Sequence, residues 1–185
     1  VYRDILGYDT IVADETVVFP DLEALPSGTQ KFRRRLLAHS QARKGSFSQL
    51  FGPSTIELVQ ALERTPKKLY EGRFWGDPGF IQVCFDIRNM EALGKHCAEL
   101  GHPFTVDTTQ QFKEGSSFDM GDAAGQFAYI EDPDGTLIEF VETHKVPIAK
   151  KLGLSINLKN RDPEKPLPKW MLKALSVMRV KPESL

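Results

Sequence analysis

The sequence predicts an α+β fold built from two related β-α-β-β-β modules, and two observations lead to this. Residues 80–144 give, in order, one strand, one helix and three strands, and the last strand contains LIEFV at residues 137–141. A near copy of that strand, TIELV, stands earlier in the chain at residues 55–59. Because self-similarity indicates a repeated supersecondary unit, residues 1–62 are expected to form a first module related to the second.

The composition describes an ordinary globular domain and excludes several classes of protein. The chain has 185 residues and a mass of 20.8 kDa, which is enough to bury a hydrophobic core. Lys and Arg number 24 against 25 Asp and Glu, so nothing favours a nucleic-acid partner. No apolar run approaches the roughly 20 residues of a membrane span. The two cysteines form neither a disulfide framework nor a thiolate zinc site. We expect a cytoplasmic protein.

In the first module, residues 1–6 are predicted to be helical and to end at Gly7, a helix C-cap residue. Strands are predicted at residues 8–13 and 55–59, whereas residues 31–38 fit a strand or a helix. Because the chain begins in what reads as the last turns of a helix, without Met, we expect it to be a fragment of a longer chain.

The second module is defined by stronger signals. Its opening strand alternates, with Gln82, Cys84 and Asp86 on one face and apolar residues on the other. Asn89 is a favourable N-cap for the helix that follows. The remaining predicted elements are that helix at residues 90–100, strands at residues 104–107, 126–130 and 136–141, and a tight hairpin turn at residues 131–135.

The two modules differ in length and at their starts. Glu57 lies 50 residues after Gly7, whereas Glu139 lies 38 residues after Gly101. Gln82 precedes Gly101 by 19 residues, and the matching position before Gly7 falls ahead of Val1. We therefore expect the first module to lack its opening strand. The modules are assigned to residues 1–62 and 80–144, with a Pro- and Gly-rich linker at 63–79 and an extension at 145–185 that holds a short amphipathic helix at 169–180.

Glu57 and Glu139 are the strongest candidates for chemistry. Each interrupts an apolar strand at the same position of the repeat, and a buried carboxylate needs a cation, a metal ion or hydrogen-bond donors. Gln82 offers an amide oxygen beside them. The alternatives are that each glutamate points to solvent and that Gln82 is an ordinary core amide with its hydrogen bonds made.

Two phrases give the chain a family resemblance: DPDGTLIEFVE at residues 132–142 and YRDILG at residues 2–7. Together with the repeated modules, they resemble the vicinal oxygen chelate superfamily. That superfamily includes glyoxalase I, methylmalonyl-CoA epimerase, extradiol dioxygenases, and fosfomycin and bleomycin resistance proteins. The resemblance covers roughly residues 1–144 and implies that the paired modules form a curled mixed sheet around a cavity. Because one fold supports many reactions, it specifies the fold better than the chemistry.

The resemblance also implies a metal site. Carried over residue by residue, it makes Glu57, Gln82 and Glu139 ligands of a divalent ion, with Glu139 or Glu57 also serving as the catalytic base. Gln82 stands where the family usually has histidine, and the fourth ligand would lie upstream of Val1. A set of oxygen donors favours Mg²⁺, Mn²⁺, Co²⁺ or Ni²⁺ over a thiolate-type Zn²⁺ site, although Zn²⁺ stays among the candidates.

The function that follows is a metal-dependent lyase or isomerase of the glyoxalase or epimerase type. It would act on a small α-hydroxy carbonyl or thioester compound through a metal-stabilised enediolate. The alternative is a non-catalytic small-molecule-binding module of the resistance type that has lost its metal. A dioxygenase is a third choice, because its ferrous site needs two histidines. Arg35, Cys84 and Trp75 are expected to line the substrate pocket. No nucleic-acid or membrane partner is expected, and the sequence allows a homodimer.

Overall fold

The computed structural model describes residues 1–74, 76–109, 118–120, 123–149 and 153–175. The chain divides into two compact units. Unit 1 comprises Val1–Ala42 and Pro53–Pro78, and unit 2 comprises Arg43–Gly52 and Gly79–Leu185. Each unit holds its own β-sheet.

Unit 1 is a three-stranded antiparallel sheet in the order β1-β2-β3. Its strands are β1 (Thr10–Val17), β2 (Phe32–Ala38) and β3 (Thr55–Ala61), and a short 3-10 helix, η1 (Pro20–Leu22), lies between the first two. The ambiguous segment 31–38 is therefore a strand. Among the described residues β3 pairs with β2 on one edge and has no neighbour on the other.

The first residues of unit 1 form a hydrogen-bonded turn instead of the predicted helix. The Ile5 amide donates to the Val1 carbonyl at 2.9 Å, and the Gly7 amide donates to the Arg3 carbonyl at 3.1 Å. These bonds have helical spacing but span too few residues to continue as a helix. Gly7 ends the turn with a φ of 75°, a conformation that suits glycine.

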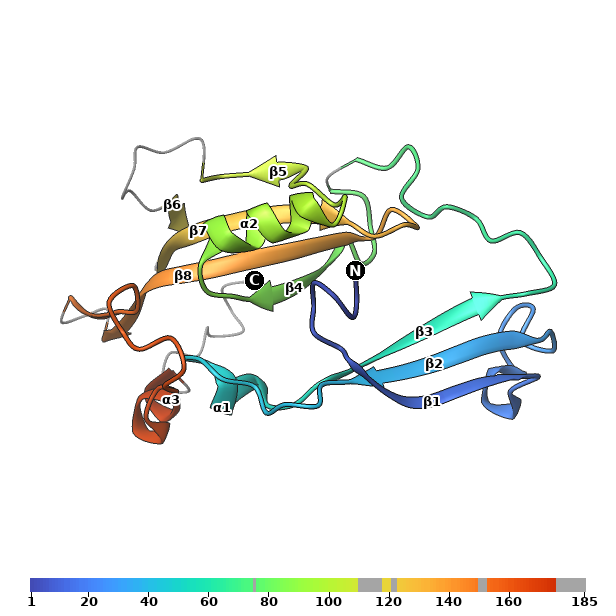
Figure 1. Cartoon of the computed structure of the whole chain (residues 1–185), viewed down its shortest axis with the longest axis horizontal. Coiled ribbons are helices and arrows are strands. Elements are labelled where there is room, and N and C mark those ends of the chain that lie inside the picture. The colour runs from blue at the N-terminus through green and yellow to red at the C-terminus, as the bar shows by residue number, and fades with distance from the viewer. Residues whose placement is uncertain (75, 110–117, 121–122, 150–152, 176–185) are drawn as a thin grey trace, which may run out of the picture. The chain divides into compact units, whose positions relative to one another are not determined.

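Unit 2 contains a six-stranded mixed sheet whose main order is β4-β8-β7-β5 (Figure 1). β4 runs parallel to β8, and every other pairing is antiparallel. The strands are β4 (Gln82–Asp86), β5 (Val106–Asp107), β6 (Phe118–Met120), β7 (Ala123–Glu131), β8 (Leu137–Ala149) and β9 (Leu154–Asn157). With few helices and sheets of mixed orientation, the chain is α+β, as predicted.

One face of this sheet packs against α2 (Met90–Glu99) and forms the core of unit 2. Ile138 and Phe140 of β8 are 1% exposed, and Met90 and Cys97 of the helix are equally buried. Figure 1 shows α2 lying across β7 and β8. Leu100, which the sequence places in the helix, is its C-cap and is exposed.

Two side chains hold the N-terminus of α2. The Asn89 side chain accepts from the Ala92 amide at 3.1 Å, as an N-cap residue does. The buried Glu142 carboxylate accepts from the Asn89 and Met90 amides at 3.0 and 2.9 Å. Glu142 lies on the same face of β8 as Phe140, so this contact confirms that α2 covers that face.

The tight turn predicted at residues 131–135 joins β7 to β8. The Asp132 carboxylate accepts from the backbone amides of Asp134 and Thr136 at 2.9 and 2.8 Å. Gly135 has a φ of 86°, which a residue with a side chain rarely adopts. This turn sets the register of the two strands, which begins with Glu131 opposite Leu137.

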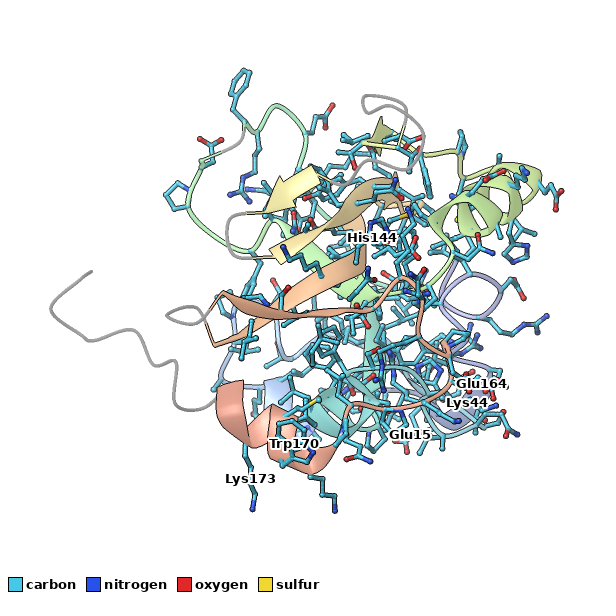
Figure 2. All side chains as sticks on the ribbon, turned by 90° about the vertical axis from the view of Figure 1, so that its left-hand side faces the viewer. Glu15, Lys44, His144, Glu164, Trp170 and Lys173 are labelled. Atoms are coloured by element: carbon cyan, nitrogen blue, oxygen red, sulfur yellow. The ribbon has the colours of Figure 1, made fainter. Side chains whose placement is uncertain are left out.

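The C-terminal extension packs against residues 43–52, which belong to unit 2 although they follow β2 in the chain. The Leu167 amide donates to the Ser46 carbonyl at 2.9 Å. Lys44 pairs with Glu164 at 3.0 Å, and the two side chains lie together in Figure 2. Two short helices belong to this region: α1 (Ser48–Phe51) and α3 (Lys169–Leu175). The rest of the predicted helix 169–180 lies outside the described residues.

No described helix combines the length and the apolar character that a bilayer span requires.

Candidate functional site

The candidate site lies on the face of the unit 2 sheet that turns away from α2. Cys84 of β4 stands opposite Glu139 of β8, and Glu139 stands opposite Tyr129 of β7. Paired residues share a face, and residues two positions apart along a strand do so too. Gln82 and Asp86 therefore join these three side chains on one surface.

Glu139 is held by two neutral hydrogen-bond donors. The Gln82 side-chain nitrogen donates to Oε2 of Glu139 at 2.5 Å, and the Tyr129 hydroxyl donates to Oε1 at 2.9 Å. Within unit 2, no described Lys, Arg or His side chain forms an ion pair with Glu139. The carboxylate is thus oriented by its neighbours without being neutralised by them.

Gln82 has one side-chain atom that the protein does not satisfy. An ionised carboxylate only accepts hydrogen bonds, so the amide nitrogen faces Glu139 and the amide oxygen points elsewhere. That oxygen is buried and has no hydrogen-bond partner among the described residues. A buried acceptor without a partner is costly and indicates a place for a water molecule or an ion.

The other two polar groups beside Glu139 keep their protons. Burial, followed by the hydrogen bond to Glu139, raises the pKa of the Tyr129 hydroxyl well above its usual range. Partial burial of the Cys84 thiol and the adjacent Glu139 carboxylate raise the thiol pKa to about 12, although the residue as a whole is exposed. Cys84 is therefore a neutral thiol at physiological pH and a poor nucleophile.

Asp86 is the second carboxyl group on this face. It is half-buried at the end of β4, and no hydrogen-bond donor reaches it from the described residues. Burial raises its pKa to about 6, while the Arg88 charge lowers the pKa and the Glu142 charge raises it. A carboxyl group with this pKa is populated in both protonation states near neutral pH.

Glu57 belongs to unit 1 and has different surroundings. Its carboxylate pairs with the Arg34 guanidinium at 2.7 Å, and Arg34 also pairs with Asp21 at 2.6 Å. The two acidic partners hold the pKa of Arg34 above its usual value, with the Asp21 hydrogen bond as the larger cause. The structure therefore brings together Gln82 and Glu139, and it gives Glu57 a cationic partner within its own sheet.

The three residues predicted to line the substrate pocket lie in different parts of the chain. Cys84 lies beside Glu139 on the unit 2 face. Arg35 lies on β2 of unit 1, on the face opposite Glu57, where it binds Asp14 together with Arg33. Those two guanidinium groups hold the pKa of Asp14 well below its usual range. Trp75 lies outside the described residues.

Tyr129 is the site residue that sequence reasoning missed. The hairpin between β7 and β8 was predicted, and its first pair is Glu131 opposite Leu137. Counting two residues away from the turn along each strand brings Tyr129 opposite Glu139. The turn therefore contained the information needed to find Tyr129, because it fixes the register of both strands.

Among the described residues, no three His, Cys, Asp or Glu side chains gather into a metal-binding group. The hydrogen-bonded group on the unit 2 face instead consists of one carboxylate, one amide and one phenol.

The architecture defines an α+β protein with a polar cluster on the face of a mixed sheet that turns away from its helix. A solved structure of a glyoxalase family protein shares this fold. The protein of this family from Bacillus cereus aligns with a TM-score of 0.50 and 15% identity, over 72% of this chain and 77% of its own. The one from Enterococcus faecalis gives a TM-score of 0.46 and 15% identity, over 76% and 82%. No family model and no curated protein matches the sequence. The chain therefore shares its fold with a glyoxalase family protein, which is the type of fold that the sequence motifs indicated.

Proposed function

We propose that the chain is a metal-dependent lyase or isomerase of the glyoxalase or epimerase type. Its substrate would be a small α-hydroxy carbonyl or thioester compound, and the reaction would pass through an enediolate. The observation that carries this proposal is the pair formed by Gln82 and Glu139. Among the described residues, the buried Gln82 amide oxygen has no hydrogen-bond partner, and the Glu139 carboxylate that Gln82 binds forms no ion pair.

These two side chains suit a hard divalent ion. Carboxylate and amide oxygens are typical ligands of Mg²⁺ and Mn²⁺, and an ion would satisfy the Gln82 oxygen. Gln82 and Glu139 would therefore hold the metal. When bound, such an ion acts as a Lewis acid toward oxygen atoms of the substrate. Glu57 stays a prediction as a further ligand, and in unit 1 an ion would compete with Arg34 for it.

The protein's own residues would orient the reaction. Tyr129 donates to Glu139 and keeps its proton, so it fixes the carboxylate without neutralising it. The neutral Cys84 thiol lies next to Glu139 and presents a small, weakly polar wall to a ligand. The apolar core on the other side of the sheet keeps this face in place, because Ile138 and Phe140 flank Glu139 in the chain and are fully buried.

The test measures metal binding directly. Protein purified without chelator is analysed by mass spectrometry for divalent ions and then titrated calorimetrically with Mn²⁺. We expect close to one ion per chain, and at least about tenfold weaker binding in Glu139→Gln and Gln82→Leu. Glu131→Gln, which changes an exposed carboxylate on the neighbouring strand, is the matched control and should bind like the wild type.

A second function, a small-molecule-binding module without metal, is favoured by one observation. Arg34 already neutralises Glu57, so the first module's glutamate needs no ion. If the wild-type protein takes up no Mn²⁺, Ni²⁺ or Zn²⁺, the metal-dependent proposal is wrong and the binding module becomes the better description.

A further inference from the structure

We propose that Asp86 is the catalytic residue that moves protons on the Glu139 face of unit 2, while Glu139 serves as a ligand. This inference rests on the proposed function and assigns the proton transfer within it to a residue outside the predicted metal site. From the sequence, Glu139 and Glu57 could each be the metal ligand or the catalytic base. Assigning the proton transfer to Asp86 separates these roles.

The position of Asp86 supports this role. Asp86 is the last residue of β4 and shares a face with Gln82 and Cys84. Its register partner is Val141, which stands two residues after Glu139 on β8. Two strand residues span roughly 6.6 Å, so Asp86 lies one small molecule's width along the sheet from the Cys84–Glu139 pair. A substrate bound at Glu139 would extend toward it.

The contacts of the two carboxylates differ in a way that separates their roles. Both oxygens of Glu139 accept hydrogen bonds from side chains of the same face. Such bonds fix the orientation of the carboxylate, which suits a ligand. Asp86 accepts no hydrogen bond from a described residue and is half-buried, so it is free to bond to a substrate.

The protonation states on this face point the same way. Cys84 and Tyr129 both have raised pKa values and keep their protons at neutral pH. The charged groups that act on Asp86 are Arg88 on the chain that follows β4 and Glu142 on β8, and burial is the largest cause of its pKa of about 6. A proton-transfer group is most efficient when its pKa lies near the working pH.

The step is a proton transfer that balances within the substrate. The Asp86 carboxylate takes a proton from the carbon next to the carbonyl group, and the C–H electron pair forms the C=C bond of the enediolate while the carbonyl electrons move to oxygen. The protonated Asp86 then returns the proton to a carbon of the enediolate. No oxidant or reductant is consumed.

The experiment follows exchange of carbon-bound hydrogen in dihydroxyacetone, a small α-hydroxy carbonyl probe, by proton NMR in D₂O with Mg²⁺ or Zn²⁺ present. We expect Asp86→Asn to lower the exchange rate at least about 100-fold while the bound metal and probe affinity stay unchanged. Asp134→Asn, which alters an exposed carboxylate in the hairpin, is the matched control and should exchange like the wild type. In the wild type the exchange rate should rise with pH, with an apparent pKa near 6.

The outcomes separate this inference from the proposed function. Suppose that the wild type and Asp86→Asn exchange hydrogen at equal rates and that Glu139→Gln exchanges none. The role of Asp86 is then wrong and the proposed function stands. If the metal-loaded wild type exchanges no hydrogen, the proposed reaction is wrong and the role of Asp86 with it. Loss of metal from Asp86→Asn would also overturn the inference, because it would make Asp86 a ligand.

Discussion

The two units place a glutamate at the same position of the same strand motif and then surround it differently. Glu57 of unit 1 is exposed and pairs with a guanidinium, which is itself shared with Asp21. Glu139 of unit 2 is half-buried and accepts from an amide and a phenol. A charged partner neutralises a carboxylate, whereas neutral donors orient it and leave its charge available. Equivalent positions in a repeat therefore do not imply equivalent chemistry.

The surroundings differ because the two sheets are stabilised differently. In unit 2 the sheet is covered by α2 and holds a buried apolar core. In unit 1, cross-strand ion pairs on both faces join its strands, such as those of Asp14 with Arg33 and Arg35. Exposed ion pairs contribute little to stability, so unit 1 is expected to be the less stable unit.

The largest effect should come from truncating the core residue next to each glutamate. Phe140→Ala removes a fully buried ring and should lower the free energy of unfolding by about 3–5 kcal/mol. Leu58→Ala, at the matching position of unit 1, removes a half-buried side chain and should cost only about 1 kcal/mol. Hydrogen exchange of the β3 and β8 amides measures both losses of stability. Equal losses of stability in the two variants would contradict the difference in packing between the units.

A smaller, pH-dependent effect should come from Asp86. Its pKa rises from 3.8 to about 6 on folding, so the folded state binds the proton more tightly and stability falls as the pH rises through that interval. Asp86→Asn removes this penalty and should stabilise the protein by roughly 1–3 kcal/mol near pH 8, with little gain near pH 4. Urea denaturation at the two pH values tests this, and a gain independent of pH would argue against it.

The smallest effects should come from the paired glutamates themselves. Glu57→Gln should cost less than about 1 kcal/mol, and the loss should vanish in about 1 M NaCl, because salt screens the exposed pair with Arg34. Glu139→Gln should cost about 1 kcal/mol in low and high salt alike, because its partners are neutral. Thermal melts at two salt concentrations compare them. A salt-sensitive loss at Glu139 would mean that a cation reaches it.

Much of the fold could be predicted because strong local signals produced it. The alternation around Gln82, the Asn89 cap and the hairpin at 131–135 each correspond to observed elements. The prediction ended the last strand of the module too early, since β8 continues through Pro147 to Ala149. Proline argues against a central strand, but near Pro147 the pairing of β8 is with β9, and the register shifts just after it.

The site was less predictable because it depends on contacts between strands. Gln82 and Glu139 could be proposed from their positions in the repeat, whereas the partner of Glu57 could not. Arg34 is one of three consecutive arginines, and which acid each one binds is set by strand register and by the position of η1. The sequence contains the charges but not their pairing.

The docking of residues 43–52 onto the C-terminal extension has a practical consequence for dividing the chain. A cut in the segment 63–79 separates the sheets in sequence, but the C-terminal piece then loses the backbone that Leu167 binds at Ser46. An independently produced fragment starting at residue 80 would expose the surface that residues 43–52 cover. The two fragments of this protein are thus better studied by co-expression or by mixing than by producing either one alone.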